Sequence, residues 1–108
     1  MIARIWQGET RSADADAYQQ VLQRTGVRDY RATPGNLGVW LLRQERGART
    51  AFVLLTLWDA RESIEAFAGR DIGQARYYDS DREYLLDFRK TVEHFDVAAA
   101  WGDLRDAA

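Results

Sequence analysis

Few side chains in this chain are suited to chemistry near neutral pH. The sequence contains one histidine, His94, and no cysteine. Histidine titrates near neutrality without perturbation, so His94 is a candidate general base or hydrogen-bond donor; the alternative is a structural histidine on a sheet face or at a dimer interface. The missing cysteines exclude disulfides, thiolate metal sites and a cysteine nucleophile. A single histidine excludes a multi-histidine metal site within one chain.

The segment from Phe67 to Tyr78 is a second place where chemistry is expected. It carries Phe67, Arg76 and Tyr77, and two glycines lower its helix propensity. A helix that breaks over a sheet leaves room beneath it, so we expect a pocket lined by Phe67, Tyr77 and aromatic residues of the strands. Such a pocket suits a flat hydrophobic ligand. The alternative is ordinary core packing, with Arg76 as a solvated surface charge.

Other ligand classes are disfavoured by pattern and charge. No glycine-rich motif follows a strand and opens a helix, so nucleotide binding is not expected. The 15 basic residues against 17 acidic ones give a net charge of −2, which does not favour nucleic-acid binding. No apolar run approaches the roughly 20 residues of a membrane span. The N-terminus lacks the layout of a signal peptide, so we expect a cytoplasmic protein.

Hydrophobic periodicity and turn residues define the elements that must position these side chains. Ser12 is a plausible N-cap of the first helix, and Gly26 is its expected C-terminal cap. Thr33-Pro34-Gly35-Asn36 is a strong turn signal. The expected strands cover 2–8, 37–46, 50–58 and 90–98, the expected helices cover 13–25, 60–68, 71–78 and 81–88, and a loop covers 27–35.

The order β-α-β-β-α-β is that of the ferredoxin-like α+β fold, a four-stranded antiparallel sheet with helices on one face. The strand over 50–58 is apolar on both of its faces, so both must be covered. Helices cover one face, and face-to-face pairing in a homodimer is the simplest cover for the other. The alternative is a cover formed by Trp101 and the C-terminal tail. We expect one domain over 1–98 and a tail over 99–108.

Three segments carry a resemblance to a known family. They are the opening strand Met-Ile-Ala-Arg-Ile-Trp, the junction from Leu57 to Phe67, and the closing strand Val-Glu-His-Phe-Asp-Val at 92–97. The pattern Leu-Trp-x-x-x-Glu-x-x-x-x-Phe is moderately specific. The chain resembles the antibiotic biosynthesis monooxygenase-like group of the dimeric α+β barrel superfamily, whose members pair their sheets across a dimer axis.

The resemblance implies several activities, because the superfamily spans several chemistries. In the monooxygenase branch, polar and aromatic residues hold a phenolate substrate and no cofactor is needed. Matched onto this chain, it points to Gln7, Trp58, Tyr77 and His94. Together with the pocket expected around Phe67 and Arg76, this gives His94 and Tyr77 as candidate catalytic residues and Gln7, Trp58, Phe67 and Arg76 as candidate substrate-binding residues. The haem-degrading branch has an axial histidine that is missing here. The matching positions are Gln7, Phe67 and Tyr77, and tyrosine is a known ligand of ferric haem.

These implications leave four functional hypotheses open. The first is a cofactor-independent monooxygenase that oxidises an aromatic or polyketide-type molecule with O2. The second is a non-redox isomerase or cyclase acting in the same pocket. The third is a ligand-binding or stress-type barrel without catalysis, in which side chains fill the space between helices and sheet. The fourth is haem binding or degradation.

Overall fold

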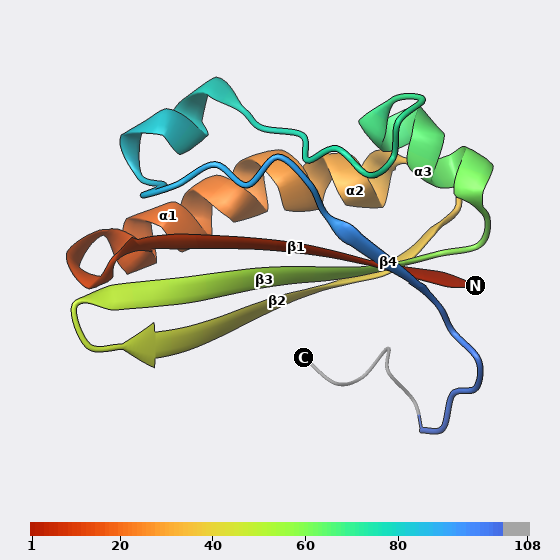
Figure 1. The fold of residues 1–108 in the computed structure, drawn as a ribbon, viewed down its shortest axis with the longest axis horizontal. Coiled ribbons are helices and arrows are strands. Elements are labelled where there is room, and N and C mark those ends of the chain that lie inside the picture. The colour runs from red at the N-terminus through yellow and green to blue at the C-terminus, as the bar shows by residue number, and fades with distance from the viewer. Residues whose placement is uncertain (103–108) are drawn as a thin grey trace.

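The computed structural model describes residues 1–102, and it consists of one antiparallel sheet with helices on one side (Figure 1). The strands lie in the order β2-β3-β1-β4, and every neighbouring pair is antiparallel. This is the predicted ferredoxin-like arrangement, and the expected fold class is confirmed. The strands are β1 (Ile2–Arg11), β2 (Asn36–Arg46), β3 (Arg49–Trp58) and β4 (Glu93–Asp96).

Alternation along the two central strands separates a helix-covered face from an open face. On β1 and β3 the even-numbered side chains point toward the helices and are buried, including Trp6, Phe52 and Trp58. Most odd-numbered side chains of the same strands, such as Ile5 and Leu55, lie on the open face and are only partly buried. Strand β3 is therefore apolar on both faces, as the sequence predicts.

The first helix differs from the sequence analysis at both of its ends. Ser12 does not cap it, because the Ser12 hydroxyl bonds to the Gly47 carbonyl and the Thr50 hydroxyl. The first helix does not end at Gly26: α1 (Ala15–Leu22) continues through a π-helical turn (Gln23–Val27) into α2 (Arg28–Ala32). The expected loop over 27–35 is therefore wrong for most of its length. The helix continues because Gly26 and Tyr30 are buried, with Gly26 against the side chains of Leu54 and Tyr30. Burial here outweighs the weak helix propensity of glycine.

The turn after α2 agrees with the prediction. Gly35 has a φ of 93°, in the left-handed region that favours glycine. A Cβ at this position would lie 2.0 Å from the hydroxyl oxygen of Ser63 on α3 (Arg61–Ala68), so no other residue fits. The helix expected over 60–68 is thus confirmed, and it packs close to this turn.

The chain between α3 and β4 differs most from the sequence analysis. No regular helix occurs over 71–78, and of the helix expected over 81–88 only a 3-10 turn, η3 (Asp79–Glu83), forms. The reason is tertiary hydrogen bonding: the amides of Ala75 and Val92 donate to the carbonyls of Lys90 and Gly73. The same pairing occupies Thr91 and shortens the strand expected over 90–98.

The 69–92 segment therefore runs as an irregular strap beside the end of β1. Leu85 bridges Thr10, and the amide of Leu86 donates to the carbonyl of Glu9. The expected tail over 99–108 lies partly outside the described residues, since the structure describes it only as far as Gly102. Among the residues that are described, no helix is long and apolar enough to cross a membrane.

Candidate functional site

A small cavity lies between the sheet and the helical layer, where the sequence analysis expects a pocket. Its volume is about 20 Å³, enough for roughly one water molecule. Strands β1 and β3, the helix from α1 to α2, α3 and the 69–92 segment all contribute to its wall. The lining residues are Trp6, Leu22, Thr25, Gly26, Tyr30, Leu54, Phe67, Arg76, Tyr78 and Asp81.

An aromatic stack forms one wall of the cavity. The rings of Tyr30 and Phe67 are stacked with their centroids 4.1 Å apart. Trp58 lies behind them, with its ring centroid 6.2 Å from that of Phe67. Its indole nitrogen donates to the Thr56 hydroxyl at 2.8 Å, so Trp58 is fully buried with its polar group satisfied. Trp58 supports the stack and does not line the cavity.

Arg76 and Tyr78 form the outer side of the cavity. The Arg76 guanidinium lies 4.8 Å from the ring centroid of Phe67 and 5.1 Å from that of Tyr78. Asp29 ties the two side chains together, since it accepts a 2.6 Å hydrogen bond from the Tyr78 hydroxyl and lies 3.6 Å from Arg76. The hydrogen bond from Tyr78 lowers the pKa of Asp29, and burial raises the pKa of Tyr78. A carboxylate and a neutral phenol therefore hold Arg76 in place.

Trp6 lines the cavity, and its indole N–H lies on the side of Tyr77, whose pKa it lowers against the raising effect of burial. The nitrogen itself is buried. The ring lies over Gly8, where an added Cβ would approach a Trp6 ring carbon to 2.7 Å, and its edge faces Tyr77.

His94 lies on the helix side of β4, directly opposite Arg4 in the sheet register. The Arg4 guanidinium is 1% exposed and donates to His94 Nε2 at 3.1 Å. It also donates to the backbone carbonyls of Ile72 and Gln74, which fixes the strap over the sheet. Burial, together with the positive charges of Arg4 and Arg61, lowers the pKa of His94, so the imidazole is neutral at pH 7 and accepts from Arg4.

The contact between Arg4 and His94 predicts that the protein becomes less stable as the pH falls below neutrality. The pKa of His94 is lowered in the folded state, so the unfolded chain binds more protons just below the ordinary value of 6.5. The stabilisation is complete above about pH 6.5 and is lost as the pH falls toward the lowered pKa. Urea unfolding between about pH 5.5 and 7.5 measures it. The His94→Gln variant keeps an acceptor for Arg4 and should lose this slope; an unchanged slope contradicts the assignment.

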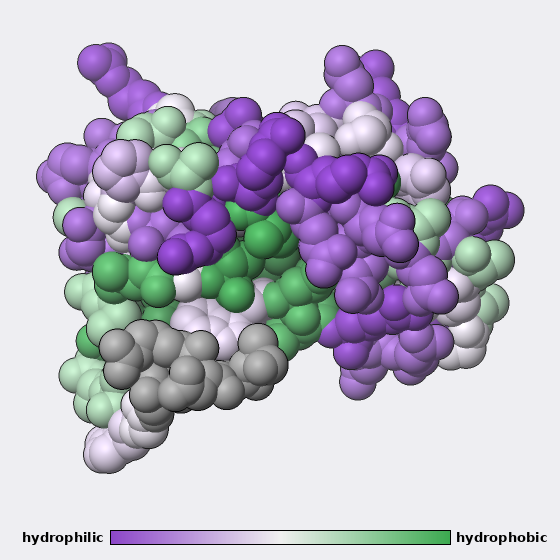
Figure 2. All heavy atoms as spheres, turned by 180° about the vertical axis from the view of Figure 1, so that it is seen from behind, coloured by the Kyte–Doolittle hydropathy of each residue, from purple (hydrophilic) through white to green (hydrophobic). Residues whose placement is uncertain are grey.

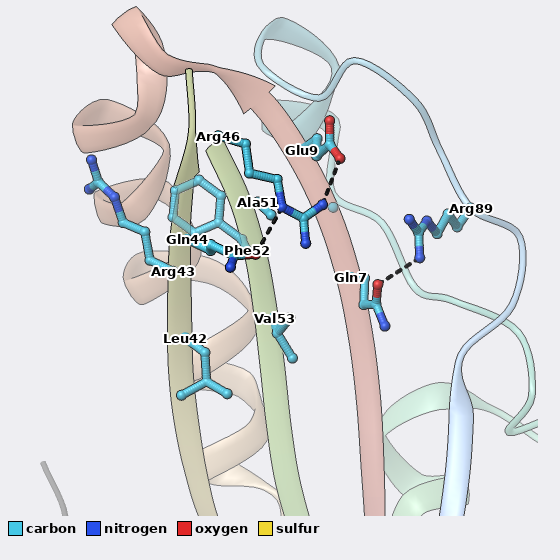
Figure 3. A pocket seen from close by; sticks show the side chains of 11 residues that line it. Gln7, Glu9, Leu42, Arg43, Gln44, Arg46, Ala51, Phe52, Val53 and Arg89 are labelled. Atoms are coloured by element: carbon cyan, nitrogen blue, oxygen red, sulfur yellow. Dashed lines mark hydrogen bonds and ion pairs between the residues drawn. The ribbon is translucent and has the colours of Figure 1, made fainter. Parts of the chain in front are cut away.

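Gln7 does not join the other predicted site residues. It points to the open face of the sheet, where its side-chain oxygen accepts a 2.8 Å hydrogen bond from Arg89 (Figure 3). A shallow hollow of about 110 Å³ lies there, and Glu9 in its wall faces Arg46 at 3.6 Å. This hollow and the sheet–helix cavity are on opposite faces of the sheet.

The structure thus brings together only some of the residues chosen from sequence. Phe67 and Arg76 line the cavity, Trp58 lies behind Phe67, and Tyr77 packs on Trp6, with its hydroxyl donating to the Arg89 carbonyl. His94 pairs with Arg4 outside the cavity lining. Sequence reasoning missed the residues Trp6, Asp29, Tyr30, Tyr78 and Asp81. Trp6 and Tyr30 could have been chosen from the sequence, because both are aromatic residues: Trp6 is at strand spacing and Tyr30 is at helix spacing.

The fold of the chain is shared with several solved structures. A structure of a protein named as an antibiotic biosynthesis monooxygenase, from Nitrosomonas europaea, matches with a TM-score of 0.68 at 16% identity. The match covers 92% of this chain and all of that one. The predicted resemblance is confirmed at the level of the fold.

Two further solved structures share the fold. The heme-degrader MhuD from Mycobacterium tuberculosis, with two hemes bound in its active site, matches with a TM-score of 0.55 at 20% identity, over 94% of this chain and all of that one. A NIPSNAP domain protein from Burkholderia xenovorans matches with a TM-score of 0.61 at 17% identity, over 95% of this chain and all of that one. No family model and no curated protein matches the chain significantly.

Proposed function

We propose that the protein is a small-molecule enzyme that oxidises a hydroxylated aromatic compound with O2 without a bound cofactor. The observation that carries the proposal is the sheet–helix cavity, walled by Trp6, Tyr30 and Phe67 and closed on its outer side by Arg76. The fold, shared with a protein named as an antibiotic biosynthesis monooxygenase, supports it. We also propose a homodimer joined through the open face, with polyketide-type aromatics as the substrate class.

The proposed reaction needs little from the protein. A base removes a proton from the substrate, and the resulting anion reduces O2; one oxygen atom enters the substrate and the other leaves as water. The substrate supplies all the electrons, so no reductant is required. The protein must stabilise the anion and exclude water. Aromatic walls exclude water, and the guanidinium of Arg76 lies where an anion can be stabilised.

Substrate entry requires a local movement. The cavity of about 20 Å³ is too small for an aromatic ring, so Arg76 and Tyr78 must swing outward. Both are side chains at the surface of the irregular strap, and Arg76 is 41% exposed. Side-chain rearrangement of this kind is common at binding sites.

Oxygen consumption tests the proposal directly. Anthrone- and hydroquinone-type compounds are added to the protein in an oxygen-electrode cell, with heat-unfolded protein as the control. Consumption only with folded protein supports the proposal, and none across the panel rejects it. Turnover that persists without O2 indicates the isomerase or cyclase alternative. Unchanged turnover in His94→Ala and Tyr77→Phe would remove the catalytic roles predicted for these two residues.

Haem does not fit the residues present. His94 Nε2 is bonded to the cation of Arg4, and the Tyr77 hydroxyl is bonded to the Arg89 carbonyl, so neither is free to ligate iron. Within residues 1–102 no group of three or more potential metal ligands is present either.

We therefore expect a flat titration with hemin. Adding hemin to the protein at micromolar concentration should give the spectrum of free hemin, without the sharpened Soret band of a ligated haem. Bovine serum albumin serves as a positive control for nonspecific uptake. A saturable Soret band that disappears in Tyr77→Phe would contradict the expectation and revive the haem hypothesis.

A further inference from the structure

The buried guanidinium of Arg4 holds both the strap and His94 through one nitrogen atom. Nη1 donates to the Ile72 carbonyl and to His94 Nε2, which lies 3.1 Å away, and Nη2 donates to the Gln74 carbonyl at 3.3 Å. Arginine can only donate, so the imidazole is the acceptor and carries its own proton on Nδ1. The protonation state of His94 is therefore coupled to the bonds that hold residues 72–74 over the sheet.

The stretch of the strap that Arg4 holds, residues 70–76, has few other attachments to the body of the protein. Ile72 is its only buried side chain. Its backbone pairs with residues 90–92 through two hydrogen bonds and one isolated bridge. A segment with so little buried apolar surface belongs to the part of a fold that opens at the lowest cost. The two carbonyl bonds from Arg4 are therefore a large share of what keeps this stretch in place.

Residues 70–76 follow a position where the chain can turn, and they end in the wall of the sheet–helix cavity. Gly69 has a φ of 92°, in the left-handed region that favours glycine, and an added Cβ there would meet no atom within 4 Å. Arg76 lines the cavity and donates to the Phe67 carbonyl at 3.0 Å, with a side chain that is 41% exposed. When the stretch moves away from the sheet, Arg76 moves with it and the cavity opens.

A proton added to His94 would bring a second cation against Arg4. Within residues 1–102 no carboxylate pairs with Arg4, which is 1% exposed. Burial lowers the pKa of His94, and so do the two charged groups that act on it from the elements packed against it, Arg4 on β1 and Arg61 on α3. The other ionisable side chains of β4 and of the start of the strap are exposed: Glu93, Asp96, Arg70 and Asp71. A protonated imidazole would therefore face Nη1 with N–H against N–H and no anion between them.

We propose that Arg4 and His94 form a pH-sensitive latch: neutral His94 keeps the strap closed, and its protonation releases residues 70–76, which turn at Gly69 and open the sheet–helix cavity. The latch goes beyond the proposed function, because it controls access to the cavity and requires no particular substrate or reaction. Histidine is suited to this role, since it changes charge close to physiological pH. The strap is closed at neutral pH, and its open form gains population as the pH falls.

Backbone hydrogen exchange of the full chain in low concentrations of urea tests the latch at single residues. The amides of Ala75 and Val92 donate to the carbonyls of Lys90 and Gly73, and both bonds break when residues 70–76 move away. We expect these two amides to exchange through a local opening that urea hardly affects. The amides of the β1–β3 ladder should exchange through global unfolding, which urea promotes steeply.

The pH dependence of this exchange identifies the group that operates the latch. In the open form His94 titrates near its ordinary pKa of 6.5, so protection of the two amides should fall up to about tenfold between about pH 7.5 and 5.5. The comparison is made after correction for the intrinsic pH dependence of exchange. His94→Gln keeps an acceptor for Arg4 and does not titrate, so its protection should be the same at both pH values. Arg61→Gln is the matched control: it removes the other cation that acts on His94 and should keep most of the pH effect.

Three results would overturn the latch, and none of them bears on the proposed reaction. If Ala75 and Val92 exchange with the urea dependence of the β1–β3 ladder, the strap does not open by itself. If their protection in the wild type is the same at both pH values, protonation does not release the strap, and this result decides the question even when His94→Gln fails to fold. If the pH effect persists in His94→Gln, a group other than His94 operates the opening. Asp81 cannot imitate the effect, because burial raises its pKa and its protonation favours the folded form.

Discussion

Replacing Leu55 with aspartate is expected to convert a dimer of about 25 kDa, twice the 12.4 kDa of the chain, into a monomer. Leu55 lies on the open face of β3, paired with Ile5 on β1 and Trp40 on β2. The same face carries Leu42 and Phe95, which are 47% and 51% exposed in the single chain. Figure 2 shows an apolar area in the middle of one side of the molecule, bordered by hydrophilic side chains.

The effect of Leu55→Asp on dimer stability is large because a twofold dimer contains the substitution twice. In a twofold dimer each substitution occurs twice, so two leucine side chains leave the interface and two carboxylates enter it. Each leucine contributes roughly 1.5–3 kcal/mol by burial, and an unpaired buried carboxylate costs several kcal/mol more. A dimer constant in the micromolar range does not survive such a loss. Light scattering after size exclusion measures the mass.

A control on the other side of the molecule isolates the interface. Gln20→Asp adds the same charge to an exposed position of α1 and should leave the mass unchanged. A wild-type protein that is monomeric at micromolar concentration would refute the dimer. A Leu55→Asp protein that remains dimeric would show that a different surface joins the copies.

Three features of the sheet could be predicted because local patterns determine them. The β2–β3 hairpin, the two apolar faces of β3 and the turn at Gly35 each follow from residues close together in sequence. The helix beyond Gly26 and the strap over 69–92 could not be predicted from such patterns. Gly26 is kept helical by contacts with Leu54, and the strap is held by Arg4 and by backbone bonds to 90–92. These contacts join residues distant in sequence, so propensity does not reveal them.

Some residues of the candidate site were missed for a related reason. Gln7 and Trp6 are neighbours on β1, and a one-residue difference reverses the face on which a side chain lies. The sequence analysis chose Gln7, whereas Trp6 lines the cavity. His94 was chosen for its residue type, and its partner Arg4 lies 90 positions away across the β1–β4 ladder. Phe67 and Arg76 were found because their segment is short and aromatic.

Removing the Asp81 carboxylate is expected to destabilise the protein more than any other polar change considered above. Asp81 is 3% exposed and accepts hydrogen bonds from the hydroxyl of Tyr18, which is fully buried, and from the amide of Tyr78. The bond from Tyr18 ties the strap to α1, and the bond from Tyr78 closes a turn within the strap. Asp81→Ala leaves two buried donors without partners, at about 2–4 kcal/mol together. Tyr18→Phe leaves the carboxylate with one of its two partners and should cost about 1–3 kcal/mol.

The Asp81→Asn variant separates hydrogen bonding from charge. Its amide can accept from the Tyr78 N–H and donate to the Tyr18 hydroxyl oxygen, so it should lie within about 1 kcal/mol of the wild type at neutral pH. Burial raises the pKa of Asp81 in the folded state, so the folded protein binds this proton more tightly than the unfolded chain. The stabilising contribution of the protonated carboxyl is therefore present below the ordinary value near 3.8 and is lost as the pH rises through the raised pKa.

The free energy of unfolding of the wild type, minus that of Asp81→Asn, should accordingly fall as the pH rises from about 3 to 7, because asparagine does not titrate. Urea denaturation of the wild type, Asp81→Asn, Asp81→Ala and Tyr18→Phe at each pH measures this difference. A difference that rises with pH would mean that hydrogen bonding outweighs burial at Asp81. Equal costs for Asp81→Ala and Asp81→Asn would mean that the bonds to Tyr18 and Tyr78 do not hold the strap.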